Sequence, residues 1–403
     1  MPGPVDRRSE PAATGGTSLY VHVPFCVVKC GYCDFNSYVV EDRTVHDRFL
    51  DALAVELRAT WHGPEPVSVF IGGGTPSLLD PPRFARLFAI LGERVDLRRC
   101  AEVTIEANPE SLTREKAQIA RAAGVSRASI GVQSFHPHHL RFLDRAHDGD
   151  RAAAAFADLR AAGFTNLSLD LMFGIPGETL DEWLADLERA LTLRPDHLSC
   201  YNLTFEPGTR LHHAHERGDV AANDQEVDRA MFLATRERLA AADFLAYEIS
   251  NFAGRGGPCR HNDHYWLQGD YVGIGPGAAS HRGGVRATNL KPVDAWARAA
   301  LAGEPCAGSA ETLRLPQRAA EAVWLGLRRT AGVDLMAVQE RLQWPAIDAF
   351  ATVIADHAAR GLVAWDGRHL RLTDDGLLLA DRVSADYLAV GVVGVRSRPA
   401  ERP

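Results

Sequence analysis

Three cysteines lie within ten residues, in the string CVVKCGYCDF at 26–35. Their spacing is Cys26-x3-Cys30-x2-Cys33, and thiolates this close together suit zinc or an iron-sulfur cluster. A structural zinc site needs four ligands, usually as two pairs, and the sequence holds no second cysteine pair. A cluster of four irons can accept three cysteines from one loop and leave its fourth iron open. The spacing therefore favours a 4Fe-4S cluster with one reactive iron; zinc completed by His22 or another histidine is the alternative.

A glycine run, Gly72-Gly73-Gly74-Thr75, follows the apolar string VSVFI at 67–71. Glycine has no Cβ, so its backbone can approach a ligand closely and offer amides or carbonyls. Triple glycines are most often turns, but this run follows a predicted strand, as the cysteine loop does. We therefore expect the run and the loop to line one site.

Short apolar or β-branched runs alternate with longer amphipathic segments, which is typical of repeated βα units around a parallel sheet. The predicted strands are 18–23, 67–71, 101–107, 127–132, 166–172 and 197–203, and the predicted helices are 43–60, 81–92, 113–123, 150–162 and 179–192. Six such units fit a barrel or a doubly wound sheet, and periodicity alone does not separate the two. In a barrel, functional residues gather at the carboxyl ends of the strands, where the cysteines and glycines are expected.

The pattern changes after about residue 205. A helix is predicted near 222–242, and the glycine-dense segment 254–284 is predicted to be irregular. From Leu313 onward, two helices precede the string GLVAWDGRHLRLT, in which Asp366-Gly367 predicts a tight hairpin, and a further helix follows. This order predicts a small winged-helix-like domain. Its hairpin has few clustered Lys or Arg residues, so we expect a structural or partner-docking role instead of DNA binding.

Four segments are therefore predicted. They are a disordered tail (1–17), a partial α/β barrel (18–250), a glycine-rich segment that closes the barrel (251–312) and the C-terminal domain (313–403).

Composition narrows the class of protein. No apolar run approaches the roughly 18 residues that cross a bilayer, and the first 17 residues lack the apolar segment of a secretory signal. The net charge of −8 argues against a nucleic-acid partner. Seven unevenly clustered cysteines do not suggest a disulfide framework. We therefore expect a cytoplasmic protein.

The remaining conspicuous histidines and cysteines are predicted to have no special role. Solvated surface is the expectation for the histidines, and isolated thiols for the cysteines. The residues are His136, His138, His139, His212, His213, His215, Cys100, Cys200 and Cys306.

Several strings together resemble the radical S-adenosylmethionine (SAM) superfamily: YVHVPFCVVKCGYCDFNSY, FIGGGTPSLL, TIEANPES, GVQSF, LDLMFGIPGET and CRHNDHYW. Within it they are similar to the oxygen-independent coproporphyrinogen III oxidase-like group, and in that group to the HemW branch of heme chaperones. The resemblance covers nearly the whole chain from about residue 18. It implies an α/β fold with a partial (β/α)6 radical SAM barrel, and the cofactors 4Fe-4S cluster, SAM and heme.

The resemblance also implies which residues bind the cluster and SAM. Cys26, Cys30 and Cys33 would hold the cluster, and the methionine end of SAM would lie against Gly73, Gly74 and Thr75. Further family positions near the cluster or SAM are Tyr20, Tyr32, Glu106, Gln133, Arg145 and Asp170. Arginine pairs with carboxylates, and acidic side chains accept from ammonium or ribose hydroxyl groups. Ordinary polar residues at a barrel rim are the alternative, and Arg145 is expected on a helix.

The string CRHNDHYW matches the HNxxYW pattern of the HemW branch, which is associated with heme handling. A neutral imidazole is a common axial ligand of heme iron, and Tyr and Trp rings can pack on a porphyrin. His261 is the predicted heme ligand, and His264, Cys259 and His281 are competitors. The alternative is a loop whose aromatic rings close the open barrel and whose histidines form local hydrogen bonds.

Phe35 separates two functions. The oxidases of the group continue the cysteine motif as CxxxCxxCxC, whereas Phe35 stands two residues after Cys33 here. This favours a carrier that passes heme to an apo-cytochrome or another heme-accepting protein, including one in a membrane. The alternative is a radical SAM oxidase that converts coproporphyrinogen III to protoporphyrinogen IX.

Overall fold

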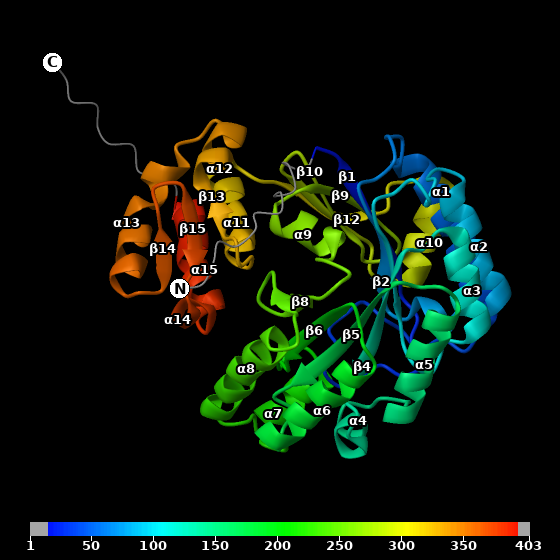
Figure 1. Ribbon diagram of the computed structural model, residues 1–403. Coiled ribbons are helices and arrows are strands. Elements are labelled where there is room, and N and C mark those ends of the chain that lie inside the picture. Colours follow the sequence, from blue (N-terminus) through cyan, green and yellow to red (C-terminus); the bar gives the residue numbers. More distant parts are fainter. Residues whose placement is uncertain (1–14, 394–403) are drawn as a thin grey trace.

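The computed structural model describes residues 15–393 of the chain (Figure 1). Six parallel strands lie side by side in chain order and form the centre of a large sheet. They are β1 (Thr17–Val23), β2 (Val69–Gly73), β3 (Val103–Ala107), β4 (Arg127–Gln133), β5 (Asn166–Phe173) and β6 (His197–Asn202). All six lie within three residues of their predicted bounds, and the sheet remains open, so the predicted partial (β/α)6 arrangement is confirmed.

Helices cover one face of this sheet (Figure 1). They are α1 (Arg43–Thr60), α2 (Pro81–Gly92), α3 (Arg114–Ala123), α5 (Gly149–Ala161), α6 (Leu180–Thr192) and α8 (Gln225–Ala240). The short helices α4 (Pro137–Phe142) and α7 (Arg210–Glu216) contribute to a separate apolar cluster beside the cysteine loop, and a 3-10 turn spans Pro76–Leu78. Successive strand side chains point to opposite faces. In β1, Leu19, Val21 and Val23 join the buried apolar core under the helices. The alternate residues Tyr20 and His22 therefore face the concave side, which is polar.

The segment after α8 extends the sheet at both ends. At one end, β8 (Asn251–Ala253) pairs antiparallel with β6, and β7 (Leu245–Ala246) pairs with β8. At the other end, β9 (Asp270–Ile274) pairs parallel with β1, followed by β10 (Ala279–Arg282), β11 (Val285–Asn289) and β12 (Ala307–Thr312) in antiparallel order. Two helices belong to this segment, α9 (Arg260–Trp266) and α10 (Val293–Ala302).

Two predictions for this segment are therefore wrong. The glycine-dense stretch 254–284 is not irregular, because it contains α9, β9 and β10. Its strands do not close the barrel, because they lengthen an open sheet. The glycines allow neighbouring backbone segments to pack closely. A Cβ on Gly273 would lie 2.1 Å from the Ala279 carbonyl oxygen, and a Cβ on Gly275 would lie 2.4 Å from the His22 carbonyl oxygen. Glycine density here indicates crowded strands, which composition alone does not distinguish from loop.

The C-terminal part has its own apolar core and a three-stranded sheet. Its elements are α11 (Leu315–Leu327), β13 (Val333–Asp334), α12 (Leu335–Leu342), α13 (Ala346–Ala359), β14 (Val363–Trp365), β15 (His369–Leu372), α14 (Asp374–Leu377) and α15 (Ala380–Val393). Leu335, Phe350 and Tyr387 are fully buried in the core. The predicted hairpin is confirmed, since β14 and β15 pair antiparallel around Gly367, whose φ is +94°. This order of elements agrees with a winged-helix-like arrangement.

No helix between residues 15 and 393 is both long enough and apolar enough to cross a lipid bilayer. The predicted tail lies mostly outside the described residues, and Thr17 already belongs to β1.

Candidate cofactor site

The three cysteines lie in the loop that leaves the carboxyl end of β1. The loop is closed at its base, because the Cys26 amide donates to the Tyr38 carbonyl at 3.0 Å and the Tyr38 amide donates to that of Pro24 at 2.7 Å. Within the loop, the Cys33 amide donates to the Cys30 carbonyl at 3.2 Å. All three thiols are free and partly exposed. Folding therefore presents three unpaired sulfurs from one short segment.

The spread of these sulfurs bears on the choice between zinc and a cluster. Zn–S bonds of about 2.3 Å place the sulfurs of a tetrahedral site about 3.8 Å apart. In the described structure, at least two of the three cysteine sulfurs lie more than 4.8 Å apart. The loop thus holds its sulfurs more widely than one zinc ion requires, which suits a ligand with several metal atoms.

Burial changes the acidity of the cysteine thiols. It raises the pKa of Cys26 and of Cys33 above the ordinary value, and hydrogen bonds from Thr75 and from the Phe35 backbone offset part of this rise. The thiols of Cys26 and Cys33 are therefore protonated at neutral pH. Metal binding requires thiolates, so binding would release these protons.

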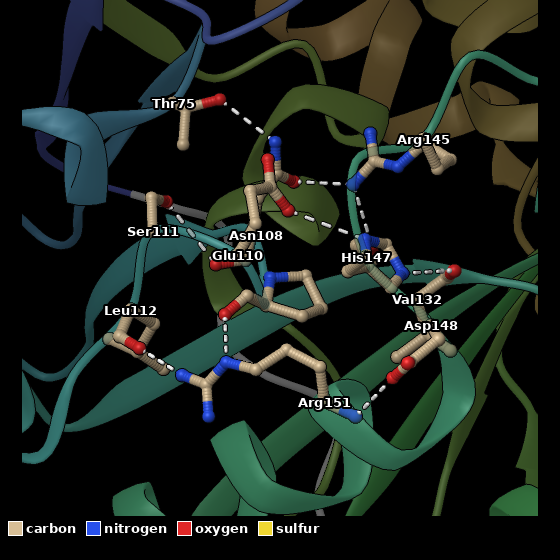
Figure 2. A network of polar contacts seen from close by, with 12 residues as sticks. Thr75, Asn108, Glu110, Ser111, Leu112, Val132, Arg145, His147, Asp148 and Arg151 are labelled. Carbon is tan, nitrogen blue, oxygen red and sulfur yellow. Dashed lines mark hydrogen bonds and ion pairs between the residues drawn. The ribbon is translucent and has the colours of Figure 1, made fainter.

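A polar network lies at the ends of β2, β3 and β4 (Figure 2), and hydrogen bonds to Cys26 and Cys30 connect it to the cysteine loop. Thr75 Oγ1 donates to Cys26 Sγ at 3.6 Å and accepts from Asn108 Nδ2 at 2.9 Å. Arg145 donates to Asn108 Oδ1 at 2.8 Å, to the Gly131 carbonyl at 2.7 Å and to Cys30 Sγ at 3.7 Å. Two cysteines of the loop thus receive hydrogen bonds from one continuous network.

Sequence reasoning missed part of this network. Arg145 was expected on a helix, but it lies in the loop between α4 and α5. Asn108 was not predicted, although it lies in the string TIEANPES, two residues after Glu106. His147 was also missed; its ring contacts Glu110 Oε2 at 3.3 Å and the Val132 carbonyl at 3.1 Å (Figure 2). A polar residue just past a strand end was the only available signal.

The amides of the glycine run are already occupied. Gly73 donates to Glu106 Oε2 at 3.0 Å, Gly74 to the Val23 carbonyl at 2.8 Å, and Thr75 to the Phe25 carbonyl at 2.7 Å. A Cβ on Gly74 would lie 2.7 Å from the carbonyl oxygens of Val23 and Phe25, so glycine is required for this approach. The run can therefore offer carbonyl oxygens to a ligand, but not these amides.

Below the network, a cavity of about 200 Å³ opens on the concave face of the sheet. Its lining includes the predicted residues Tyr20, Glu106, Asp170 and His261. Asp170 accepts from Ser129 Oγ at 2.8 Å. Burial raises the pKa of Glu106 to about 7, and it raises the pKa of Asp170 as well. Two carboxyl groups in one cavity disfavour joint ionisation, so the cavity suits a positively charged ligand group.

Gln133 and Tyr32 lie outside this cavity lining. Gln133 ends β4 with φ +68°, a left-handed conformation that non-glycine residues rarely adopt, at a register shift against β5. Tyr32 packs with a small apolar cluster that includes Leu143 and Leu211. The predicted residues therefore occupy the network, the cavity and this apolar cluster, and not one pocket.

His261 is fully buried, and both of its ring nitrogens have partners. Nδ1 lies 2.8 Å from Ser68 Oγ, and Nε2 lies 2.8 Å from Tyr265 Oη. Burial lowers the pKa of His261 to about 3, so the ring is neutral. Glu102 accepts from the backbone amides of Arg260 at 3.1 Å and His261 at 3.2 Å. In this conformation His261 offers no free nitrogen to a metal.

The other residues of the HNxxYW segment connect the barrel to the C-terminal part. Asp263 pairs with Arg329 of the chain after α11 at 2.7 Å, and the Arg328 guanidinium lies 4.7 Å from the Trp266 ring centre. His264 Nε2 lies 2.7 Å from the Asp270 carbonyl. These contacts agree with the alternative expectation, a segment whose histidines form local hydrogen bonds.

A larger cavity, of about 520 Å³, lies beside the cysteine loop. Its lining includes Cys30, Cys33, Val28, Val39 and Arg210. Val28 is 43% exposed and Val39 is 53% exposed, so the rim presents apolar side chains beside the charged Lys29, Asp34 and Arg210. Ligand pockets usually span about 300 to 1,000 Å³, and this cavity falls in that range whereas the inner one does not.

The strand topology and the three-cysteine loop define a radical SAM protein. The Radical SAM superfamily model matches residues 20–190, and the HemN C-terminal domain model matches residues 313–379. The heme chaperone HemW of Mycobacterium tuberculosis is 41% identical over 372 residues, which cover 91% of this chain and 93% of that protein. HemW of Bacillus subtilis is 36% identical and covers 92% of this chain and 99% of that protein. The chain belongs to the HemW family.

A solved structure is also similar. The Escherichia coli coproporphyrinogen III oxidase HemN, described as a radical SAM enzyme, superposes with a TM-score of 0.80 at 25% identity. The match covers 93% of this chain and 91% of that one. The oxidase and this chain therefore share a fold, so the fold does not separate carrier from oxidase.

Proposed function

We propose that the protein is a heme chaperone that binds a 4Fe-4S cluster, SAM and heme, and transfers heme to apo-acceptor proteins in the cytoplasm or at a membrane. The observation that carries this proposal is Phe35, in the place where the oxidases of the group carry a further cysteine. Its side chain is 57% exposed at the rim of the cysteine loop, so it fills no structural need in the core. Membership of the HemW family supports the same function.

The chain's own residues are assigned as follows. Cys26, Cys30 and Cys33 hold the cluster, and Arg145 stabilises the thiolate of Cys30 through its hydrogen bond. When both are bound, the chemistry supplied is transfer of one electron from the reduced cluster to the sulfonium of SAM. Carbonyl oxygens of the glycine run contact the methionine end of SAM.

The remaining predicted SAM contacts are part of this proposal. Glu106 and Asp170 lie in the same inner cavity, and a cationic ligand group bound there would favour their ionised forms. Tyr20, Tyr32 and Gln133 complete the predicted set.

Heme has two candidate sites in this proposal. His261 remains the predicted ligand, but its Nε2 must first leave Tyr265. The outer cavity offers a second surface, because its volume suits a larger ligand and its rim exposes the apolar side chains of Val28 and Val39.

Three variants separate these heme sites in an anaerobic hemin titration of reconstituted protein. If His261 is the ligand, His261→Ala weakens hemin binding, whereas Tyr265→Phe frees Nε2 and leaves the affinity equal or higher. If the outer cavity holds heme, Val28→Asp weakens binding and His261→Ala does not. Val28 is exposed, so its substitution leaves the core intact. Unchanged hemin affinity in His261→Ala would contradict the His261 assignment.

Oxidation of coproporphyrinogen III is the second candidate function, supported by the similarity to HemN. It predicts protoporphyrinogen IX from reconstituted protein with SAM and a reductant. We expect none, because Phe35 cannot supply the sulfur that the oxidases have there.

A further inference from the structure

Two histidines of α4, His138 and His139, contact Glu182 in the first turn of α6. His138 Nε2 lies 3.1 Å from Glu182 Oε1, and His139 Nε2 lies 3.8 Å from Glu182 Oε2. One ligand atom from each of these three side chains lies within 4.8 Å of the other two. His139 was predicted to be solvated surface, and this prediction is wrong, because the residue is 2% exposed.

His139 carries a buried nitrogen without a hydrogen-bond partner. Its Nε2 is shielded from water and makes no hydrogen bond within the described residues. Such atoms are rare in folded proteins, and each one calls for an explanation such as an ion. Burial and the neighbouring His138 lower the pKa of His139 to about 4, so the ring is neutral at physiological pH. A neutral imidazole is the form that binds metal.

Glu182 is held in place by its own helix terminus. Its Oε2 accepts from the Thr179 amide at 2.9 Å and from Thr179 Oγ1 at 2.8 Å, in a capping box. These bonds lower the pKa of Glu182, so it is ionised. Its Oε1 faces His138. Fixed orientation of a carboxylate by such outer hydrogen bonds is typical of metal ligands.

We propose that His138, His139 and Glu182 bind one divalent transition-metal ion of the zinc type. Two imidazoles and one carboxylate suit zinc or ferrous iron better than calcium or magnesium, which prefer oxygen ligands. Zinc bonds of about 2.0 to 2.1 Å place tetrahedral nitrogen and oxygen ligands about 3.4 Å apart. His138 Nε2 lies 3.1 Å from Glu182 Oε1, which is close to this value, and His139 Nε2 lies 3.8 Å from the other oxygen of the same carboxylate. The His138 side chain is 52% exposed, so the ion has access from solvent and a position for water.

The location gives the ion a role. His138 and His139 lie between Gln133 at the end of β4 and Arg145, which contacts Cys30. An ion that joins them to Glu182 would fix the start of this segment against α6. The site is separate from the cysteine loop and does not depend on the proposed heme function.

The test is zinc binding by full-length protein whose cysteine loop has been reconstituted with iron and sulfide, because free thiols would compete for the metal. Competition with a chromogenic chelator measures affinity and stoichiometry. We expect one zinc ion per chain, and at least about tenfold weaker binding in His139→Ala and in Glu182→Gln. Glutamine still caps the helix at this position, so the second variant keeps the fold.

His213→Ala is the matched control, since His213 also contacts a helix glutamate, Glu216, at 3.1 Å but lies on the surface. Its zinc affinity should equal that of the unmodified protein. Zinc should also raise the melting temperature of the unmodified protein and not that of Glu182→Gln, because only a bound ion stabilises the fold. If His139→Ala does not fold, the zinc affinities of Glu182→Gln and His138→Ala test the proposal. Zinc affinity that is unchanged in Glu182→Gln, or lowered as much in His213→Ala, would overturn the proposal.

Discussion

Among single residues, the three loop cysteines carry the first test. Cys33→Ser should abolish the 4Fe-4S cluster, because one iron then lacks its thiolate. Visible absorption and electron paramagnetic resonance after anaerobic reconstitution measure the loss. Cys100→Ser is the matched control, since Cys100 is a free, partly exposed thiol far along the chain from the loop. A cluster of normal yield in Cys33→Ser would show that this residue is not a ligand.

Glu106 supplies a pH-dependent prediction. Its pKa is raised from an ordinary value of 4.5 to about 7 by burial. The stability that its protonated form contributes is complete below about pH 4.5 and is lost as pH rises through about 7. Glu106→Gln keeps an acceptor for the Gly73 amide but cannot ionise. It should therefore be more stable than the unmodified protein at about pH 8.5, by on the order of 1 to 2 kcal/mol, and nearly equal at about pH 5.

Urea unfolding of both proteins without added cofactors at the two pH values measures this difference. A stability difference that does not change with pH would mean that Glu106 titrates normally in the folded protein.

The sequence predicted some of these residues and not others, and the reason is physical. Cysteines and glycines stand out because their chemistry and backbone freedom are unusual. Asn108 does not, because its role arises from contacts with Thr75 and Arg145, which lie 33 and 37 residues away. The buried state of His139 likewise depends on α6, which no local pattern around His139 contains.

At the level of elements, the loops after β2, β3 and β4 meet through Asn108 (Figure 2). Asn108→Ala removes the donor to Thr75 and the acceptor for Arg145. Loss of the hydrogen-bond partners of such partly buried groups lowers the free energy of unfolding by about 1 to 3 kcal/mol. Asn108→Asp should cost less, because its carboxylate still accepts from Arg145. Urea midpoints of the two variants test this order, and equal stability of Asn108→Ala and the unmodified protein would contradict the network's importance.

Elements were predicted well where hydrophobic alternation is regular. The strands β1 to β6 alternate apolar and polar side chains or are continuously apolar, and the helices between them are amphipathic, so periodicity found them. Strands β9 and β10 were missed because the glycines in and around them reflect backbone crowding, such as that between Gly273 and Ala279. Such crowding depends on partners that are distant in sequence. The place of α9, which contacts Glu102 and Arg329, could not be inferred either.

For the whole molecule, a HemN-like fold is compatible with both the heme chaperone and the oxidase. The choice between these two functions therefore depends on a few positions. Phe35 is one, and the HNxxYW segment is another. The segment joins barrel and C-terminal part through Asp263 and Arg329, so it has a structural role whether or not it also contacts heme. The boundaries predicted between the four segments of the chain stay a prediction.

The most direct test compares heme transfer with coproporphyrinogen turnover in one anaerobically reconstituted preparation that contains SAM and a reductant. Hemin-loaded protein is mixed with an apo-cytochrome, and heme transfer is followed by absorption; a second sample receives coproporphyrinogen III, and products are analysed by chromatography. The heme-chaperone function predicts heme transfer to the acceptor and no protoporphyrinogen IX. Formation of protoporphyrinogen IX without heme transfer would contradict it.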